Sequence, residues 1–291
     1  FEDIWIQPAA GDAGGALGAA LEVWNQSLSN KGINHAASLT LPESTGDDMN
    51  GSLLGPEYNE KEICEALSGF DAVYLRFDEG ELLDRVSELL EDGKIVGWFQ
   101  GRMEFGPRSL GNRSILGDPR LVSLQSSINR KVKFRESFRP FAPAVLEERS
   151  SEYFDLKGSS PYMLKVANVA ESQLKKVLDK EEEGFDRIKY ERSTIPAVTH
   201  VDGSARVQTV NKNQNPLFWK LLKCFESKTN CGVLLNTSFN VRGEPVVCTP
   251  EDAYRCFVNT SIDWLAIGPF LLKRGDQPEA IPQQEFDPIP D

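Results

Sequence analysis

Hydrophobic and polar positions along the chain follow helical spacing in some segments and short apolar runs in others, a mixture typical of an α/β protein. Helical spacing predicts helices over residues 16–28, 59–68, 79–91, 216–228 and 250–259. Short apolar runs predict strands that begin near Ile4, Asp71, Lys94, Phe141, Tyr162, Ile195, Ala205, Val233 and Trp264. These runs imply a sizeable sheet with helices packed against it.

Irregular segments divide this pattern into three parts. Residues 1–55 hold a strand over residues 4–7, a glycine-rich turn over residues 11–15, the first predicted helix, and a connection rich in Gly, Ser, Asn and Pro. Residues 56–275 form the main predicted domain, in which the strongly charged segment 174–192 predicts a solvated surface. Residues 276–291 contain four prolines and predict an irregular tail.

Length and composition narrow the class of protein. No apolar run approaches the roughly 20 residues that a membrane-spanning helix needs, so we expect no membrane partner. The five cysteines lack CxxC spacing, which argues against a disulfide framework and favours a cytoplasmic location. The chain begins with Phe1 and shows no signal-peptide pattern, so we expect its start to be a cut within a longer protein.

The charge is unevenly distributed. A net charge of −12 disfavours nucleic-acid partners, because nucleic acids are themselves polyanions. Residues 97–140 nevertheless hold nine basic and three acidic side chains, so this segment carries +6 and the remainder carries −18. A compact cationic segment inside an acidic protein suits a small polyanion such as a nucleotide or a phosphate ester.

The densest signal for a ligand site is GWFQGRMEFGPRSLGNRSILGDPR, over residues 97–120, in which a strand runs into a loop. The four glycines that follow the strand, Gly101, Gly106, Gly111 and Gly117, let backbone amides approach an anion, and the arginines supply planar, permanently charged groups that match phosphate oxygens. The plain alternative is an exposed loop whose arginines pair with surface carboxylates. The interleaved aromatic residues favour burial instead, and buried arginines need anionic partners.

Three later motifs add candidate site residues. RKVKFRESFRP and NTSFNVRGEPVV contribute Lys133, Arg135, Arg139, Asn236, Ser238, Asn240 and Arg242. A solvated turn is the alternative for the first of these motifs. In the third, THVDGSARVQTV, His200 is followed by Asp202 and Arg206. A histidine near a carboxylate and an arginine is a candidate for proton transfer, because its pKa lies near neutrality, although a single strand histidine is more often structural.

Taken together and in this order, PAAGDAGGALGAAL and the four motifs resemble the carbamoyltransferase family of nodulation-factor and antibiotic O-carbamoylation. Members of that family have an N-terminal actin/hsp70-type domain followed by a YrdC-like domain. The resemblance implies an α/β fold with a YrdC-like twisted mixed sheet and flanking helices, preceded by a short strand-turn-helix remnant of the actin/hsp70-type domain. TSFNVRGEP resembles the TSxNxxGxP stretch of YrdC proteins, and Lys133 with Arg135 resembles their KxR pair.

The resemblance also implies the chemistry. Carbamoyl-adenylate is formed from carbamoyl phosphate and ATP, for which Mg is the expected counter-ion, and the carbamoyl group then passes to a hydroxyl of a small acceptor. The resemblance gives catalytic roles to His200, Arg108, Arg206 and Arg242. It gives binding of carbamoyl phosphate and ATP to Arg102, Arg108, Lys133, Arg135, Arg139, Asn236, Ser238 and Asn240.

The chain departs from the family pattern at the metal site. The first domain of the family supplies an HxxxH metal pair, whereas His35 and His200 lie far apart here. Asp12 matches the carboxylate ligand of the family, but one carboxylate holds a metal poorly. We therefore expect iron or another divalent metal only in the full-length protein, whose missing N-terminal domain is the expected partner, and no acceptor transfer by this chain. A threonylcarbamoyl-adenylate synthase-like tRNA-modification enzyme and a non-catalytic nucleotide- or phosphate-binding module remain as alternatives.

Overall fold

A mixed sheet of nine strands forms the centre of the computed structural model, which describes residues 6–29, 49–175 and 190–278. The strand order is β1-β9-β8-β2-β3-β7-β4-β6-β5. The pairs β2–β8 and β4–β6 are parallel, and the other pairs are antiparallel. The strands are β1 (Leu75–Arg76), β2 (Val96–Phe99), β3 (Arg113–Gly117), β4 (Ala142–Leu146), β5 (Lys165–Asn168), β6 (Ser204–Val210), β7 (Val233–Ser238), β8 (Trp264–Ile267) and β9 (Phe270–Lys273).

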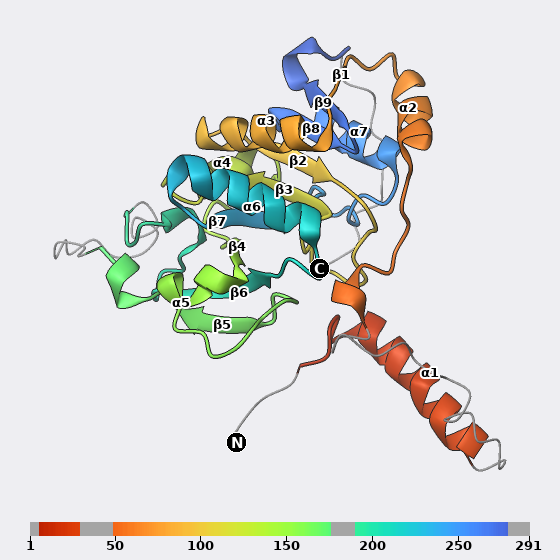
Figure 1. Cartoon of the computed structure of the whole chain (residues 1–291), viewed down its shortest axis with the longest axis vertical. Coiled ribbons are helices and arrows are strands. Elements are labelled where there is room, and N and C mark those ends of the chain that lie inside the picture. The colour runs from red at the N-terminus through yellow and green to blue at the C-terminus, as the bar shows by residue number, and fades with distance from the viewer. Residues whose placement is uncertain (1–5, 30–48, 176–189, 279–291) are drawn as a thin grey trace.

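Helices pack along the sheet. Figure 1 shows α3 (Glu79–Glu91) and α6 (Pro216–Thr229) side by side in front of it, whereas α1 (Asp12–Ser29) projects away. Leu124 of α4 (Leu124–Lys131) lies against Gly117 of β3, where an added Cβ atom would meet the leucine at 2.6 Å. The remaining helices are α2 (Glu60–Ser68), α5 (Ser150–Tyr153) and α7 (Pro250–Val258), with short 3-10 helices η2 (Asn50–Ser52), η3 (Glu147–Arg149), η4 (Glu171–Gln173), η6 (Pro196–Val198) and η7 (Arg274–Asp276).

Side-chain caps fix where several helices begin. The carboxylate of Asp78 accepts a hydrogen bond from the amide of Glu81 and so starts α3. Asn59 and Glu62 form a reciprocal capping box at the start of α2. Thr249 and Asp252 do the same for α7, whose first residue is a proline that has no amide proton to satisfy. These local signals explain why the helices predicted over residues 59–68, 79–91, 216–228 and 250–259 are confirmed to within one residue at each end.

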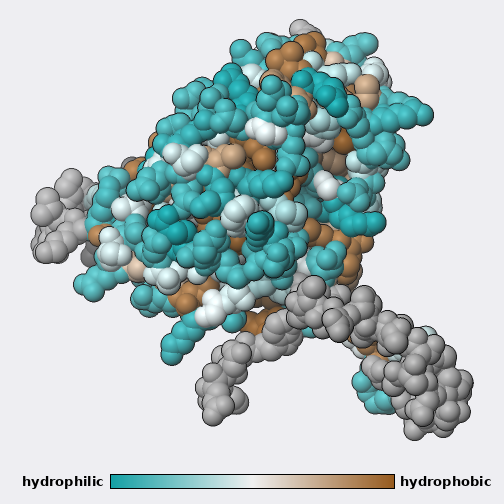
Figure 2. Space-filling view, in the orientation of Figure 1, coloured by the Kyte–Doolittle hydropathy of each residue, from teal (hydrophilic) through white to brown (hydrophobic). Residues whose placement is uncertain are grey.

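Most of the core is one large apolar cluster that joins both ends of the sheet, and a second, small cluster consists of Leu110, Ala142, Tyr162 and Met163. The large cluster includes fully buried side chains from strands and helices alike, among them Trp98, Phe218 and Phe257. The face in Figure 2 is mainly hydrophilic, with scattered apolar side chains. None of the helices in the described ranges combines the length and apolar character that a bilayer span requires.

The predicted α/β fold class, a mixed sheet with flanking helices, is confirmed. Three local predictions are wrong. The helix α1 begins at Asp12 rather than near residue 16, so the turn occupies residues 8–11 instead of 11–15. The run at Ile195 forms the 3-10 helix η6, because Pro196 cannot donate to a strand ladder. The run at Asp71 gives only the two-residue strand β1.

Other differences lie at the ends of the chain and in the cationic segment. Of the strand predicted over residues 4–7, residues 4 and 5 lie outside the described part, and residues 6 and 7 form no strand. Residues 279–291 of the predicted tail and residues 176–189 of the charged segment also lie outside it. The strand β3 (RSILG) and the helix α4 (LQSSINRK) were not predicted, because each contains only two large apolar residues.

Candidate functional site

The candidate site lies at the edge of the sheet where β7 ends and where β4 and β6 begin. The register pairs Ala142 at the start of β4 with Asn236 near the end of β7. It also pairs Ala144 of β4 with Gln208 of β6, in parallel. The segments that precede β4 and β6 and the segment that follows β7 therefore meet at one edge. These are the segments that carry the RKVKFRESFRP, THVDGSAR and NTSFNVRGEP motifs.

Lys133 is the innermost cation of this edge, with only 3% of its side chain exposed. Its Nζ atom donates to Asn240 Oδ1 at 2.7 Å, to the Asn240 carbonyl at 3.1 Å, to Ser238 Oγ at 3.2 Å and to the Ser238 carbonyl. All four acceptors are neutral, and no carboxylate in the described part of the chain forms an ion pair with it. Burial, and secondarily the nearby Arg135, lowers the pKa of Lys133 to about 7.

Three arginines surround Glu136 beside this lysine. Arg242 lies 3.7 Å from the Glu136 carboxylate, and both side chains are about half exposed. A hydrogen bond from its own backbone amide lowers the pKa of Glu136, and the charges of Arg242, Arg139 and Arg135 lower it further. Burial and the charge of Arg139 lower the pKa of Arg135 to about 10. The Nε atom of Arg135 donates to Asn129 Oδ1 at 2.7 Å, which fixes its position.

His200 forms a short hydrogen-bonded chain with its neighbours. Ser204 Oγ donates to Asp202 Oδ1 at 2.7 Å and lies 3.0 Å from His200 Nδ1. Because the single hydroxyl proton is used by Asp202, the Nδ1 atom must carry the ring proton and donate to Ser204. Burial lowers the pKa of His200, and Arg206 and Arg192 lower it further, against the opposing charge of Asp202. At neutral pH the ring therefore presents an unprotonated Nε2 atom.

Arg206 links the histidine to the glycine-rich loop. Burial lowers the pKa of Arg206, and the charge of Arg108 lowers it further, so these two arginines lie within electrostatic reach of each other. One terminal nitrogen of Arg206 lies 3.9 Å from the Met163 sulfur, and its buried Nε atom has no hydrogen-bond partner among the described residues. A half-buried guanidinium with such weak partners is suited to an anionic ligand.

The glycine-rich loop is organised by two buried side chains that point into it. The Glu104 Oε1 atom accepts hydrogen bonds from the amides of Leu110, Asn112 and Arg113 at 2.7 to 3.2 Å. Arg113 is fully buried in β3 and donates to the carbonyls of Pro56, Gln100, Gly101 and Asn112, which are loop and strand-end groups. This arginine therefore holds the backbone together instead of facing a ligand.

Other predicted residues lie further from the Lys133 group. Arg102 is exposed and turns to the Gly55 carbonyl at 3.1 Å and the Glu57 carboxylate at 3.6 Å. Asn236 is buried and donates to the Ser109 carbonyl at 3.0 Å and to Gln208 Oε1 at 2.7 Å, which ties the glycine-rich loop to the sheet. Asp12 is exposed at the first residue of α1.

The residues that the structure describes do not fit a metal ion. Nowhere in residues 6–29, 49–175 or 190–278 do three or more His, Cys, Asp or Glu side chains form a group that could hold one. Asp12 has no such companions in these ranges.

Sequence reasoning missed two residues near the site. Arg192 is buried, donates to the Thr199 carbonyl at 3.3 Å and lies close enough to His200 to lower its pKa. It ends the charged segment that predicted a solvated surface, and no local pattern marks it as buried. Glu104 could have been found, because a single acid among glycines and arginines in an apolar loop needs donors around it.

Comparisons with known proteins identify the family of the chain. The family described as "Carbamoyltransferase C-terminus" matches residues 87–274. An uncharacterized Synechocystis protein, sll1178, is 52% identical over 98% of this chain and 46% of its own length. The nodulation protein NolO of Bradyrhizobium diazoefficiens is 40% identical over 94% of this chain and 45% of its own. The 3'-hydroxymethylcephem-O-carbamoyltransferase of Amycolatopsis lactamdurans is 30% identical over 95% of this chain and 45% of its own length.

The chain spans less than half the length of each of these three relatives. Among solved structures, full-length HypF in its phosphate- and nucleotide-bound form superposes with a TM-score of 0.41 at 16% identity, over 65% of this chain and 25% of HypF. An overlap of that extent is too small to establish a common fold. The family match covers most of the chain and includes nearly all of the candidate site. The chain therefore belongs to the carbamoyltransferase family and carries the C-terminal region of that family.

Proposed function

We propose that this chain is the YrdC-like, carbamoyl-activating part of an ATP-dependent O-carbamoyltransferase, which forms carbamoyl-adenylate from carbamoyl phosphate and ATP. The observation that carries the proposal is the gathering of Lys133, Arg135, Arg139 and Arg242 at one edge of the sheet. Both substrates are polyanions, and bringing them together requires several fixed cations. Membership of the carbamoyltransferase family makes these two substrates the natural choice.

Each group has a role in this proposal. Lys133, held by Ser238 and Asn240, receives a phosphate of ATP at the end of β7. Arg135, Arg139 and Arg242 neutralise the remaining phosphate charge. The proton that Lys133 carries when a phosphate is bound neutralises a further part of this charge. Arg108 and Arg206 bind carbamoyl phosphate beside His200. The guanidinium of Arg206 is half-buried, that of Arg108 is exposed, and the two lie within electrostatic reach of each other, so one anion can contact both. Any Mg arrives with ATP.

For the atoms to balance, one water molecule must take part. Water cleaves carbamoyl phosphate to carbamate and phosphate, and a carbamate oxygen then attacks the α-phosphorus of ATP. The bond to the β-phosphate breaks and pyrophosphate leaves. In this proposal the Nε2 atom of His200 accepts the proton from water, while Ser204 keeps the ring in the required tautomer.

Transfer to an acceptor belongs to the longer protein. The relative from Amycolatopsis is named for a hydroxymethyl acceptor, and we propose a small-molecule hydroxyl as the acceptor class here too. The missing N-terminal domain is the proposed partner, and it would also bring the iron or other divalent metal. Incubation of this chain with a hydroxymethylcephem acceptor, both substrates and added iron should give no carbamoylated product; turnover would overturn this division of labour. All five cysteines are free, which fits the proposed cytoplasmic location.

Pyrophosphate release separates this function from its alternatives. The chain is mixed with ATP and carbamoyl phosphate, or with ATP, threonine and bicarbonate. Pyrophosphate release from the mixture of ATP and carbamoyl phosphate, and not from the other mixture, supports the proposal. Release only with threonine and bicarbonate would indicate a threonylcarbamoyl-adenylate synthase. ATP binding without release from either mixture would indicate a non-catalytic module.

A further inference from the structure

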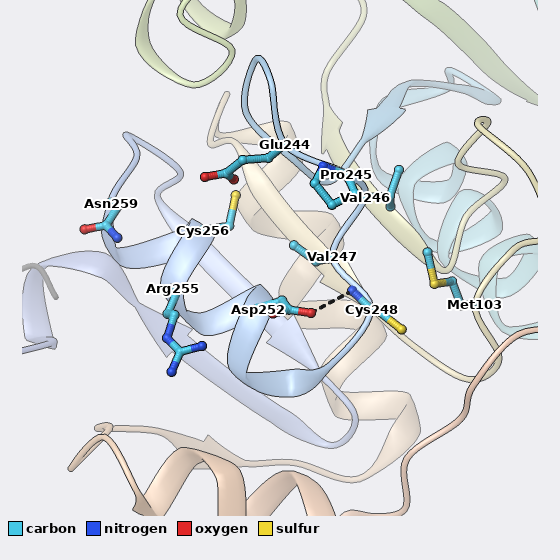
Figure 3. A pocket seen from close by; sticks show the side chains of 10 residues that line it. All are labelled: Met103, Glu244, Pro245, Val246, Val247, Cys248, Asp252, Arg255, Cys256 and Asn259. Carbon is cyan, nitrogen blue, oxygen red and sulfur yellow. Dashed lines mark hydrogen bonds between the residues drawn. The ribbon is translucent and has the colours of Figure 1, made fainter. Parts of the chain in front are cut away.

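The glycine-rich loop that carries Arg108 depends for its position on segments that precede it in the chain. At Met103 the loop borders a hollow of about 440 Å³, which residues 244–248 and the helix α7 also line (Figure 3). The Met103 backbone is held by the segment before α2. Its amide donates to the Pro56 carbonyl at 2.9 Å, and its carbonyl accepts from the amide of Gly55 at 2.9 Å.

The turn before α1, at residues 8–11, contacts the same loop at Gly106. A Cβ atom built on Gly106 would lie 2.5 Å from the Cβ atom of Ala9, so the two backbones approach too closely for a second methyl group. Pro8, the residue before Ala9, is buried, whereas Ala10 is exposed. The turn therefore rests on the loop through Ala9, although α1 itself projects away from the sheet (Figure 1).

The backbone of Ala9 is held in place by α1. Its φ angle is 54°, a conformation that alanine rarely adopts and glycine adopts freely. Its carbonyl accepts a hydrogen bond from the amide of Gly14, in the first turn of α1, at 3.0 Å. An unfavourable backbone angle persists only where the surroundings impose it, and such positions often serve function. The contact that the Ala9 methyl group makes indicates support for Gly106.

This support determines where Arg108 lies. Pro107 separates Gly106 from Arg108 and fixes one backbone angle between them, so a shift of Gly106 is passed on to Arg108. After Arg108, the loop is fixed by the amides that donate to Glu104. Arg108 and Arg206 lie within electrostatic reach and repel each other. A loop that is braced on both sides keeps these charges together before an anion arrives, and a site arranged in advance binds its ligand more tightly.

We propose that Ala9 is a positioning residue of the carbamoyl phosphate site. Its contact with Gly106 holds Arg108 in the place where an anion can reach both arginines. The proposal rests on the proposed function, which assigns carbamoyl phosphate to Arg108 and Arg206. The turn before α1 thereby serves the activating site, although its sequence, PAAG, belongs to the motif that resembles the actin/hsp70-type domain.

The test measures the binding of carbamoyl phosphate and of inorganic tripolyphosphate to the whole chain by titration calorimetry. Gly106→Ala places a methyl group against Ala9 and should weaken the binding of carbamoyl phosphate about tenfold. Tripolyphosphate, which binds at Lys133 in the proposed function, should keep its affinity. Gly158→Ala is the matched control, because Gly158 also has a positive φ angle, of 69°, but has open space where the Cβ atom would lie. It should bind both ligands as the wild type does.

Exchange of the methyl group between the two positions identifies the contact. Ala9→Gly combined with Gly106→Ala leaves one methyl group between the backbones, and the added Cβ atom then meets the Cα atom of residue 9 at 3.3 Å. This double variant should recover most of the lost affinity. Ala9→Gly alone suits the φ angle of the turn, so it serves as the test if Gly106→Ala does not fold. It should weaken carbamoyl phosphate binding about threefold, because the loop loses its brace.

Three results would overturn the proposal. The first is an unchanged affinity for carbamoyl phosphate in Ala9→Gly. The second is an equal loss of affinity for both ligands in Gly106→Ala, which would indicate a general loss of structure. The third is a double variant that recovers nothing, which would show that the effect does not pass through Ala9. A wild type that fails to bind carbamoyl phosphate would overturn the proposed function as well.

Discussion

The Nζ atom of Lys133 lies 2.7 Å from the Oδ1 atom of Asn240, a residue 107 positions further along the chain. This contact joins two of the sequence motifs at the end of β7. It also places a buried ammonium among oxygens that carry no net charge. Because a buried cation without a counter-ion is costly, the arrangement is most stable when an anion arrives.

Replacement of this lysine should strongly slow activation of the carbamoyl group. Lys133→Met removes the innermost cation but keeps much of the side-chain volume, so pyrophosphate release should fall by about a hundredfold to a thousandfold. Lys131→Met is the control, because Lys131 is exposed in the last turn of α4. Circular dichroism should show both variants folded. Normal turnover by a folded Lys133→Met variant would contradict the role of Lys133.

Phosphate binding should be linked to proton uptake. The free Lys133 has a pKa of about 7, and a bound phosphate raises this pKa because it favours the charged form. Above pH 7 the free group is mostly neutral and the bound group is charged, so binding takes up a proton and affinity falls as pH rises. At pH 9 the uptake should approach about one proton per tripolyphosphate. Titration calorimetry in buffers of different ionisation enthalpy measures this number, and Lys133→Met should lose it.

His200 should act through its unprotonated Nε2 atom. Its pKa is lowered by burial, so pyrophosphate release should lose its dependence on this group above pH 6.5 and decline only at lower pH, as the ring becomes protonated. His200→Gln should reduce the rate by about a hundredfold. Ser204→Ala should also slow the reaction, whereas Ser204→Thr, which keeps the hydroxyl, should restore it. An acid limb that is unchanged in His200→Gln would show that another group accepts the proton.

Arg113 should matter for folding more than for binding. Its guanidinium satisfies four backbone carbonyls, so Arg113→Met should lower the free energy of unfolding by about 3 kcal/mol or more. Arg130→Met, at an exposed position of α4, should change it by no more than about 0.5 kcal/mol. Urea denaturation followed by tryptophan fluorescence gives both values. Equal stabilities would contradict the structural role assigned to Arg113.

These residues show how far the sequence alone leads. Helix α3 was predictable at both ends, because its apolar spacing and the Asp78 cap are local signals. Strands were harder to predict than helices, because a strand forms only where another strand pairs with it. The run at Asp71 has a pairing partner for only two residues. The segment β3 is a strand because β2 and β7 pair with it on either side.

The candidate site, like the fold, was predictable only in part. Motif composition predicted a cationic site that includes Lys133, Arg135, Arg206 and Arg242. It treated the arginines of residues 97–120 alike as matches for phosphate and did not show that Arg113 is buried and serves the fold, because burial is a property of the tertiary structure. Nor did it predict that Arg192 would reach His200 from a charged segment. Local patterns specify which groups are present, and strand order specifies which of them meet.

Formation of the adenylate itself is the most direct measurement. The chain is incubated with Mg-ATP and carbamoyl phosphate labelled with carbon-13 in the carbamoyl group, and the products are analysed by mass spectrometry. The proposed function predicts labelled carbamoyl-adenylate together with pyrophosphate, and about a hundredfold to a thousandfold less of both from Lys133→Met. Unlabelled AMP or intact ATP in the presence of the folded wild type, with no labelled adenylate, would contradict it.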